Sequence, residues 1–151
     1  MSDTAKPETP PDLDDFLCFT IYSASHAFNR VYKPLLDALG LTYPQYLVLV
    51  ALWTKDGQTV GQLGEKLFLE SNTLTPMLKR LEALGHVTRR RDAEDERQVR
   101  VHLTEQGRNL QKQAREIPHR VLEACGLSVD RLHEMQGEIA SLRERLRKSA
   151  G

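Results

Sequence analysis

Apolar side chains recur at every third or fourth position through most of this chain, which is the spacing of one face of an α-helix. Over residues 13–39 they include Leu13, Phe28 and Leu39, and Gly40 follows directly. Glycine is favoured just beyond a helix C-terminus because it adopts the left-handed backbone conformation without strain. The pattern therefore predicts one long first helix, from residue 13 to residue 39.

Two capping-box sequences predict where the next helices begin. Thr42 precedes Gln45 by three positions, with Pro44 between them, and Thr59 precedes Gln62 by three positions. In a capping box the threonine hydroxyl and the glutamine side chain each bond a backbone N–H of the first turn. We expect a second helix from residue 42 to about residue 54 and a short third helix from residue 59.

A fourth helix is predicted by apolar residues on one face between Leu74 and Leu84, with Gly85 as its stop. Its other face carries hydrogen-bonding and cationic side chains, which suit base edges and phosphates. Pro76 lacks a backbone N–H, so we expect it near the first turn. Plain helix packing is the alternative explanation of this face. The candidate DNA contacts are Ser71, Asn72, Thr73, Thr75, Pro76, Lys79 and Arg80.

Residues 87–103 carry the pattern of a β-hairpin. Val99, Val101 and Leu103 alternate with Arg100 and His102, as in a strand with one buried face. A basic strand at 87–91 and the charged turn DAEDE precede them. A short helix, a helix with a polar outer face and a basic hairpin, in this order, indicate a winged helix-turn-helix over about residues 42–104. The predicted fold class is mainly α with a small β-hairpin wing.

The tail of the chain predicts further helices that need partners. Apolar residues repeat at steps of three and four over 110–124 and, after Ser128, over 132–146, and we expect Pro118 to kink the first of these helices. Together with the first helix they offer more apolar surface than a small winged domain can cover. This predicts an intertwined homodimer built by residues 12–40 and 105–148. An intramolecular three-helix bundle is the alternative.

The N-terminal segment and the overall composition complete this picture. Residues 1–11 contain three prolines and predict a disordered arm, while residues 12–151 are expected to form a single domain. No apolar run suits a membrane span or a secretory signal, so we expect a soluble cytoplasmic protein without a membrane partner. In that reducing compartment, Cys18 and Cys125 are not expected to form a permanent disulfide.

Charge and candidate metal ligands narrow the functional classes only partly. The 21 basic residues balance the 21 acidic ones, which as a whole-chain figure argues mildly against nucleic-acid binding. Local basic clusters, such as the one over residues 79–100, can still neutralise phosphates. The five histidines show no ligand spacing with each other or with a cysteine, which disfavours a metal sensor, and no cofactor motif is present.

Particular segments of the chain resemble a known family. They are DFLCFTIYSASHAFNRVYKPLLDALGLTYPQYLVLVAL, LESNTLTPMLKRLEALGHVTRRRDAEDERQVRVHLTEQG and the helical tail, which together cover about residues 13–146. The Asp95-x-Arg97 pair and the V-x-L-T-E-x-G strand end resemble the MarR family broadly. The DFLCF opening and the LTYPQY segment are similar to its organic-hydroperoxide-sensing branch. The resemblance implies a transcriptional repressor, not an enzyme, that binds pseudo-palindromic double-stranded DNA as a homodimer and releases it when an organic hydroperoxide oxidises the protein.

The resemblance also implies roles for individual residues. Cys18 would be the peroxidatic cysteine, Tyr32 and Tyr43 would hydrogen-bond its sulfur, and Cys125 would form a disulfide with the oxidised Cys18 of the other subunit. Arg97 would enter the minor groove of DNA, oriented by Asp95, because a long cation suits that narrow and strongly negative groove. Phosphates would be bound by Arg89, Arg90 and Arg91.

The spacing of Cys18 and Tyr32 limits how the implied sensor can be built. Tyr32 lies fourteen positions after Cys18, which is about 21 Å along a straight helix that rises about 1.5 Å per residue. A contact within one chain is therefore impossible. If the two residues pair, Tyr32 comes from the second subunit across antiparallel first helices.

Other interpretations of the same residues remain open. Cys18 on an apolar helix is also typical of a small core residue. The chain could instead be a MarR-type regulator that binds a small aromatic acid, with both cysteines inert. A thiol peroxidase is the alternative of another class, although no base or cofactor motif accompanies the cysteine. Cysteine variants and sustained peroxide consumption would separate these three functions.

Overall fold

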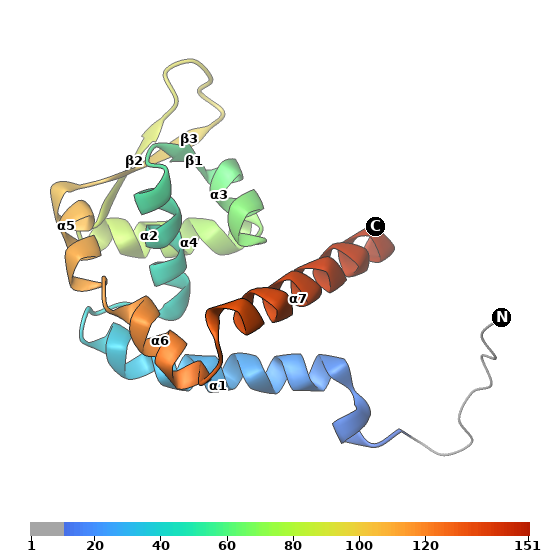
Figure 1. The fold of residues 1–151 in the computed structure, drawn as a ribbon. Coiled ribbons are helices and arrows are strands. Elements are labelled where there is room, and N and C mark those ends of the chain that lie inside the picture. Colours follow the sequence, from blue (N-terminus) through green and yellow to red (C-terminus); the bar gives the residue numbers. More distant parts are fainter. Residues whose placement is uncertain (1–10) are drawn as a thin grey trace. The chain divides into compact units, whose positions relative to one another are not determined.

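The computed structural model describes residues 11–151 (Figure 1). The predicted disordered arm, residues 1–11, lies outside the described residues except for its last position. The described elements, in chain order, are the 3-10 helix η1 (Leu13–Asp15), α1 (Leu17–Asp37), α2 (Tyr43–Thr54), β1 (Gln58–Thr59), α3 (Val60–Leu67), α4 (Ser71–Ala83), β2 (Val87–Arg91), β3 (Val99–Leu103), α5 (Glu105–Gln113), α6 (Ile117–Cys125) and α7 (Val129–Ala150).

The chain divides into two compact units, with the boundary between Gln113 and Ala114. The first unit holds every element through α5, and the second holds α6 and α7. The first unit therefore contains the whole predicted winged helix-turn-helix. A single domain over residues 12–151 stays a prediction.

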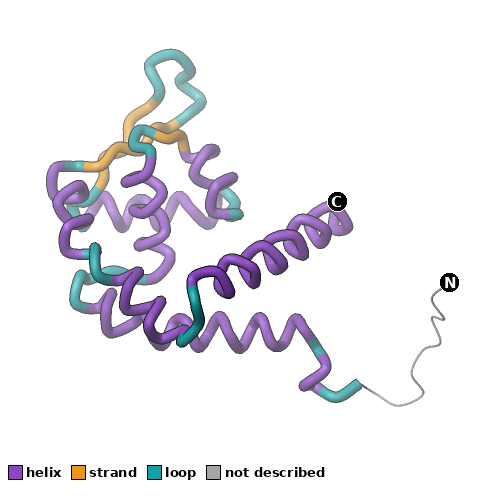
Figure 2. The backbone as a smooth tube through the Cα atoms, viewed as in Figure 1, coloured by secondary structure: helices purple, strands orange, loops and turns teal. Residues whose placement is uncertain are grey.

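A three-stranded antiparallel sheet lies beside α2, α3 and α4 in the first unit (Figure 2). Strand β3 is central, between β1 and β2, and the hairpin register pairs Val87 with Leu103 and Arg91 with Val99. The sequence pattern predicted this hairpin. It did not predict β1, because two residues are too short to show an alternating pattern. Gln58 of β1 pairs with Val101, which fixes the start of α3 to the sheet.

The core of the first unit is formed by α2, α3, α4 and the inner face of the sheet. Helix α2 buries residues on several sides, whereas α4 buries one stripe, as its sequence predicted. Two predicted members of the α4 stripe differ: Met77 is only half-buried and Leu84 is exposed, since α4 ends at Ala83. The fully buried side chains of these elements include Val48, Leu49, Leu52, Leu63, Leu74, Leu78, Leu81, Val87 and Val101.

Both capping boxes form as predicted. The Thr42 hydroxyl accepts the Gln45 N–H at 3.3 Å, and the Gln45 side chain accepts the Thr42 N–H at 3.0 Å. At α3 the same two bonds join Thr59 and Gln62, at 3.1 and 2.9 Å. Each box satisfies two N–H groups that a helix start otherwise leaves without an intrahelical acceptor.

The predicted first helix is interrupted near its start. Residues Leu13–Asp15 form a 3-10 turn capped by the Asp12 carboxylate, and Phe16 then has an extended backbone with φ of −88° and ψ of 111°. Helix α1 begins only at Leu17, so the prediction of one helix from residue 13 was wrong. The acidic cap diverts the first residues into a tighter turn, which apolar spacing alone does not reveal.

Two prolines occupy positions other than those predicted. Pro118 lies in the first turn of α6, because the expected kinked helix is broken into α5 and α6. A missing N–H costs little in a first turn, so proline marks a new helix start here. Pro76 lies in the interior of α4, five positions after Ser71, instead of near the first turn. The Thr75 hydroxyl donates to the Ser71 carbonyl at 2.8 Å beside it.

Helices α5 and α7 differ in their contacts with the rest of the chain. Helix α5 is joined to the winged fold, since the Trp53 indole N–H donates to the Gly107 carbonyl at 2.9 Å. Helix α7 begins at the predicted Ser128 cap, whose hydroxyl accepts the Arg131 N–H at 3.1 Å, and it contains no buried residue. Ile139 is 47% exposed. No helix in residues 11–151 is both long and apolar enough to cross a membrane.

Candidate functional site

The polar face of α4 is presented to solvent. Leu74, Leu78 and Leu81 anchor the opposite face of the helix in the core. Of the predicted DNA contacts on α4, Thr75 is half-buried and the others are exposed; the exposed ones are Ser71, Asn72, Thr73, Pro76, Lys79 and Arg80. The structure therefore brings hydroxyl, amide and cationic side chains together on one rigid helix, a donor and acceptor set that can address base edges and phosphates.

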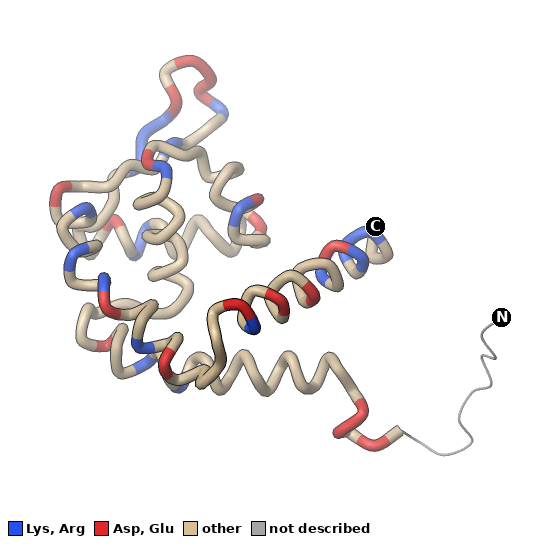
Figure 3. The backbone as a smooth tube through the Cα atoms, viewed as in Figure 1, with Lys and Arg blue, Asp and Glu red and all other residues tan. Residues whose placement is uncertain are grey.

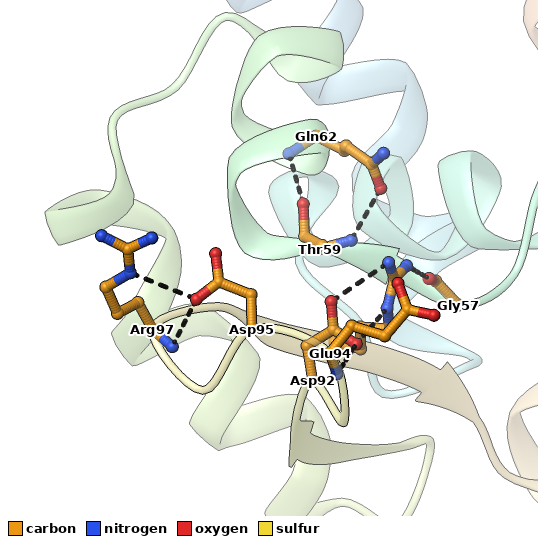
Figure 4. Close-up of polar contacts among 8 residues, drawn as sticks. Gly57, Thr59, Gln62, Asp92, Glu94, Asp95 and Arg97 are labelled. Atoms are coloured by element: carbon orange, nitrogen blue, oxygen red, sulfur yellow. Dashed lines mark hydrogen bonds and ion pairs between the residues drawn. The ribbon is translucent and has the colours of Figure 1, made fainter.

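The tip of the hairpin holds an arginine against an aspartate (Figure 4). The Asp95 carboxylate accepts the Arg97 backbone N–H at 3.1 Å and the Arg97 Nε–H at 3.2 Å, through the same oxygen. The Arg97 side chain is nevertheless 91% exposed. The aspartate thus limits the conformations of a long cation that projects from the wing.

A second arginine connects the start of β3 to the turn before β1. Arg100 donates to the Gly57 carbonyl at 2.7 Å and forms an ion pair with Asp92, at 3.4 Å from Nε to Oδ1 (Figure 4). The hydrogen bond from Arg100 holds the pKa of Asp92 below its usual range. Asp56, in the same turn, accepts the Leu103 N–H at 2.8 Å. Sequence reasoning singled out none of these contacts; those of Gly57 and Asp56 join segments 43 and 47 positions apart, and that of Asp92 links β3 to the hairpin turn.

The three consecutive arginines of β2 have different surroundings. Arg89 is half-buried and donates to the carboxylate of Glu82 on α4, at 3.0 Å from Nη2 and 3.3 Å from Nε. Arg91 donates to the Glu96 carbonyl at 2.8 Å, and Arg90 is exposed. All three were predicted to bind phosphates, but the guanidinium of Arg89 already has a carboxylate partner.

Basic and acidic residues form separate blocks along the hairpin. Figure 3 shows basic positions along the strands and acidic positions towards the tip. Whole-chain neutrality therefore conceals a local pattern in which cations and anions of the wing are adjacent. Two of the wing carboxylates, those of Asp92 and Asp95, are paired with arginines, and exposed cations of α4 and the wing are available to phosphates.

The two cysteines are free thiols in different units of the chain. Cys18 is exposed in the first turn of α1. Cys125 is half-buried and is the last residue of α6, where Gly126 follows in the left-handed conformation at φ of 65°. A thiol in either position is reachable for chemistry from outside its own chain.

The predicted tyrosines lie together but away from Cys18 of the same chain. The ring centroids of Tyr32 and Tyr43 are 4.7 Å apart, and Tyr46 lies 5.9 Å from Tyr32. Burial raises the pKa values of Tyr43 and Tyr46, so both stay protonated hydroxyl donors at neutral pH. Because α1 is continuous from Leu17 to Asp37, Cys18 and Tyr32 are separated by about 21 Å of helix at about 1.5 Å per residue. Sequence reasoning missed Tyr46, whose helical spacing looks like ordinary core.

No cluster of three or more histidine, cysteine or acidic side chains that could hold a metal ion occurs within residues 11–151.

Comparison with known proteins gives three consistent similarities. The family described as "Transcriptional regulator SarA/Rot" matches residues 30–114. The HTH-type transcriptional regulator TtmR of Methylorubrum extorquens is 48% identical over 151 residues, covering 100% of this chain and 77% of the relative. The organic hydroperoxide resistance transcriptional regulator of Bacillus subtilis is 46% identical over 134 residues, covering 89% of this chain and 91% of the relative.

Solved structures of AbfR, a protein of Staphylococcus epidermidis, are also similar. Reduced AbfR bound to DNA has a TM-score of 0.77 and 38% identity, covering 92% of this chain and 95% of the other. Disulfide-formed AbfR has a TM-score of 0.59 at 38% identity, with 90% of each chain covered. The similarity extends across both units of the chain in sequence.

Proposed function

Because the chain belongs to the MarR family of winged-helix transcriptional regulators, next to the organic hydroperoxide resistance regulators, we propose that it is a repressor that senses organic hydroperoxides through Cys18. The named relatives are regulators, not enzymes. The observation that carries the proposal is that the rings of Tyr32 and Tyr43 lie together. Tyr32 is too far along α1 for this pair to contact Cys18 of its own chain.

The separation of the Cys18 thiol from the tyrosines of its own chain supports a sensor shared by the two subunits of a homodimer. If α1 of two copies cross in antiparallel fashion, Cys18 of one copy lies beside the tyrosine pair of the other. The exposed apolar residues of α1, Leu17 and Phe28 among them, gain a partner in the same arrangement. Tyrosine hydroxyls can then donate to the sulfur and favour its thiolate, the reactive form.

The proposed reaction is a two-step oxidation. The Cys18 thiolate attacks one oxygen of an organic hydroperoxide, an S–O bond forms, the O–O bond breaks, and the alcohol leaves with a proton from the medium. The resulting sulfenic acid is attacked by Cys125 of the second subunit, so that a disulfide forms and water leaves. A thiol reductant reverses the disulfide. The existence of AbfR structures in a reduced DNA-bound form and a disulfide form supports this cycle.

The DNA-binding part of the proposal rests on α4 and the wing. We place the exposed face of α4 in the major groove and Arg97, held by Asp95, in the adjacent minor groove. A two-fold symmetric dimer would read a pseudo-palindrome whose half-sites lie about 34 Å apart. Oxidation releases DNA if it moves the two α4 helices away from that spacing, and a hundredfold loss of affinity needs only about 2.7 kcal/mol.

The test compares wild type, Cys18→Ser and Cys125→Ser before and after one equivalent of cumene hydroperoxide. Non-reducing electrophoresis and intact mass follow the thiols, and fluorescence anisotropy follows binding to a duplex that the reduced wild type selects from a random pool. We expect wild type to form a covalent dimer and lose DNA, Cys18→Ser to do neither, and Cys125→Ser to stop at the sulfenic acid.

Two results would replace this proposal. Equal DNA binding by all three proteins after peroxide, without covalent dimers, would favour a regulator that binds a small aromatic acid. Sustained consumption of peroxide in the presence of excess thiol would favour a thiol peroxidase.

A further inference from the structure

Glu82 is an acidic residue on the side of α4 that carries the candidate DNA contacts. It follows Thr75 by seven positions and Ser71 by eleven, and because about 3.6 residues make one turn, the three lie close to one line along the helix. Thr75 and Glu82 are both half-buried, in agreement with this alignment. An unpaired carboxylate on that line would repel phosphates.

Arg89 donates three hydrogen bonds to the Glu82 carboxylate. One carboxylate oxygen accepts Nη2–H at 3.0 Å and Nε–H at 3.3 Å, and the other accepts the Arg89 backbone N–H at 3.0 Å. These bonds hold the pKa of Glu82 below its usual range. The side chains of Arg89 and Glu82 are 25% and 38% exposed, so the pair is partly shielded from solvent.

This contact has two consequences for a DNA-binding surface. It joins the last turns of α4 to the third residue of β2, so the wing leaves the helix in a fixed direction. It also withholds the first of three consecutive arginines from the phosphates, while Arg90 stays exposed. A surface with fewer available cations binds arbitrary DNA less strongly, and discrimination then depends more on base contacts.

We propose that Glu82 is a specificity-determining positioning residue, which binds Arg89 in order to fix the wing on α4 and to keep that arginine from contacting DNA phosphates. This inference rests on the proposed function, since it presupposes a DNA-binding repressor. It assigns Arg89 a role different from the phosphate contact that the resemblance implies.

The test measures binding of reduced protein to two duplexes, one selected by the wild type from a random pool and one of shuffled sequence, from 50 to 300 mM salt. The variants are Glu82→Gln, Arg89→Gln and the double variant, each checked for helicity and oligomeric state. Glu94→Gln is the matched control, because it removes one wing carboxylate that has no ion pair in the part of the chain that the structure describes.

We expect Glu82→Gln to bind the shuffled duplex about fivefold to tenfold more tightly near 0.1 M salt, because the freed Arg89 releases a counterion. The slope of log K against log salt then steepens by about 0.9 for each arginine that gains a phosphate. Binding to the selected duplex improves less or weakens, so the ratio of specific to non-specific affinity falls. Arg89→Gln keeps the wild-type slope, and the double variant loses the steepening.

The outcomes separate this inference from the proposed function. If the slope of log K against log salt is shallower for Arg89→Gln than for wild type, by about 0.9 per site, Arg89 contacts phosphate and the inference is wrong. An equal change in Glu94→Gln and Glu82→Gln would also overturn it, since general charge would then explain the effect. Should Glu82→Gln fail to fold, the slope of Arg89→Gln decides. If the reduced wild type selects no sequence, the proposed function itself fails.

Discussion

Replacing Gly107 by alanine tests how α5 is fixed to the winged unit. Gly107 is buried, and a Cβ added there would lie against the carbonyl oxygen of His86, 3.0 Å from the His86 carbonyl carbon and 3.3 Å from Cδ2 of Leu103. The His86 carbonyl cannot yield easily, because it accepts the Thr104 N–H at 3.0 Å. Relief would have to come from displacing α5, which also moves the Gly107 carbonyl away from Trp53.

The expected cost follows from these contacts. Overpacking of a well-packed site costs about 1–3 kcal/mol, and loss of the Trp53 hydrogen bond costs about 1 kcal/mol. Alanine regains about 1 kcal/mol over glycine through its helix propensity. We therefore expect Gly107→Ala to lower the free energy of unfolding by about 1–3 kcal/mol, a sizeable part of the stability of an ordinary domain.

Urea denaturation followed by tryptophan fluorescence measures this loss at one fixed protein concentration, because dimerisation makes stability depend on concentration. The midpoint should fall while the slope m is unchanged. Gly61→Ala is the matched control on α3, where the nearest neighbour of the added Cβ is Thr59 Oγ1 at 3.8 Å. A Gly107→Ala protein as stable as Gly61→Ala would refute the close packing of α5 on His86.

Two further predictions concern local stability. Thr59→Ala removes the hydroxyl that accepts the Gln62 N–H and should cost about 1 kcal/mol in the same denaturation assay; Thr59→Ser, which keeps an acceptor, should recover most of it, and equal stability of both variants would contradict the capping role. His86 is buried, and burial lowers its pKa below the ordinary value of 6.5. The unfolded chain therefore binds this proton more readily, so stability is complete above about pH 6.5 and falls as the pH drops towards the folded pKa. His86→Gln should flatten the dependence between pH 7.5 and 5.5, and an unchanged slope would exclude His86 as its source.

Local signals predicted the elements of the winged unit, and long-range contacts account for what was missed. The Thr42 and Thr59 capping boxes gave the starts of α2 and α3, because a cap is specified within four residues. The hairpin followed from alternation over Val99–Leu103. Strand β1 exists only because Gln58 and Thr59 pair with β3, a contact that no local pattern encodes.

For the candidate site too, local contacts were predictable from the sequence and long-range contacts were not. Exposure of the α4 face and the contact between Asp95 and Arg97 agree with sequence expectations, since both arise within a few residues. The carboxylate partner of Arg89 lies on α4, whereas Arg91 bonds a carbonyl of the hairpin turn, so three adjacent arginines looked equivalent in the sequence although their surroundings differ. The family resemblance singled out Tyr32 and Tyr43 as partners of the Cys18 sulfur, and only the packing of α1 against α2 shows that their rings lie together.

Zero net charge is compatible with a DNA-binding surface because of how the arginines are paired. Arg89, Arg97 and Arg100 each have a carboxylate partner. The partners of Arg97 and Arg100 belong to the wing hairpin itself. Exposed pairs such as that of Arg97 are weak in water, so a phosphate or a minor groove can compete with Asp95 for the guanidinium. The partly shielded pairs of Arg89 and Arg100 are held by additional hydrogen bonds and exchange less readily. One cation thus stays available at the wing tip, while the other two fix the direction in which the wing presents it.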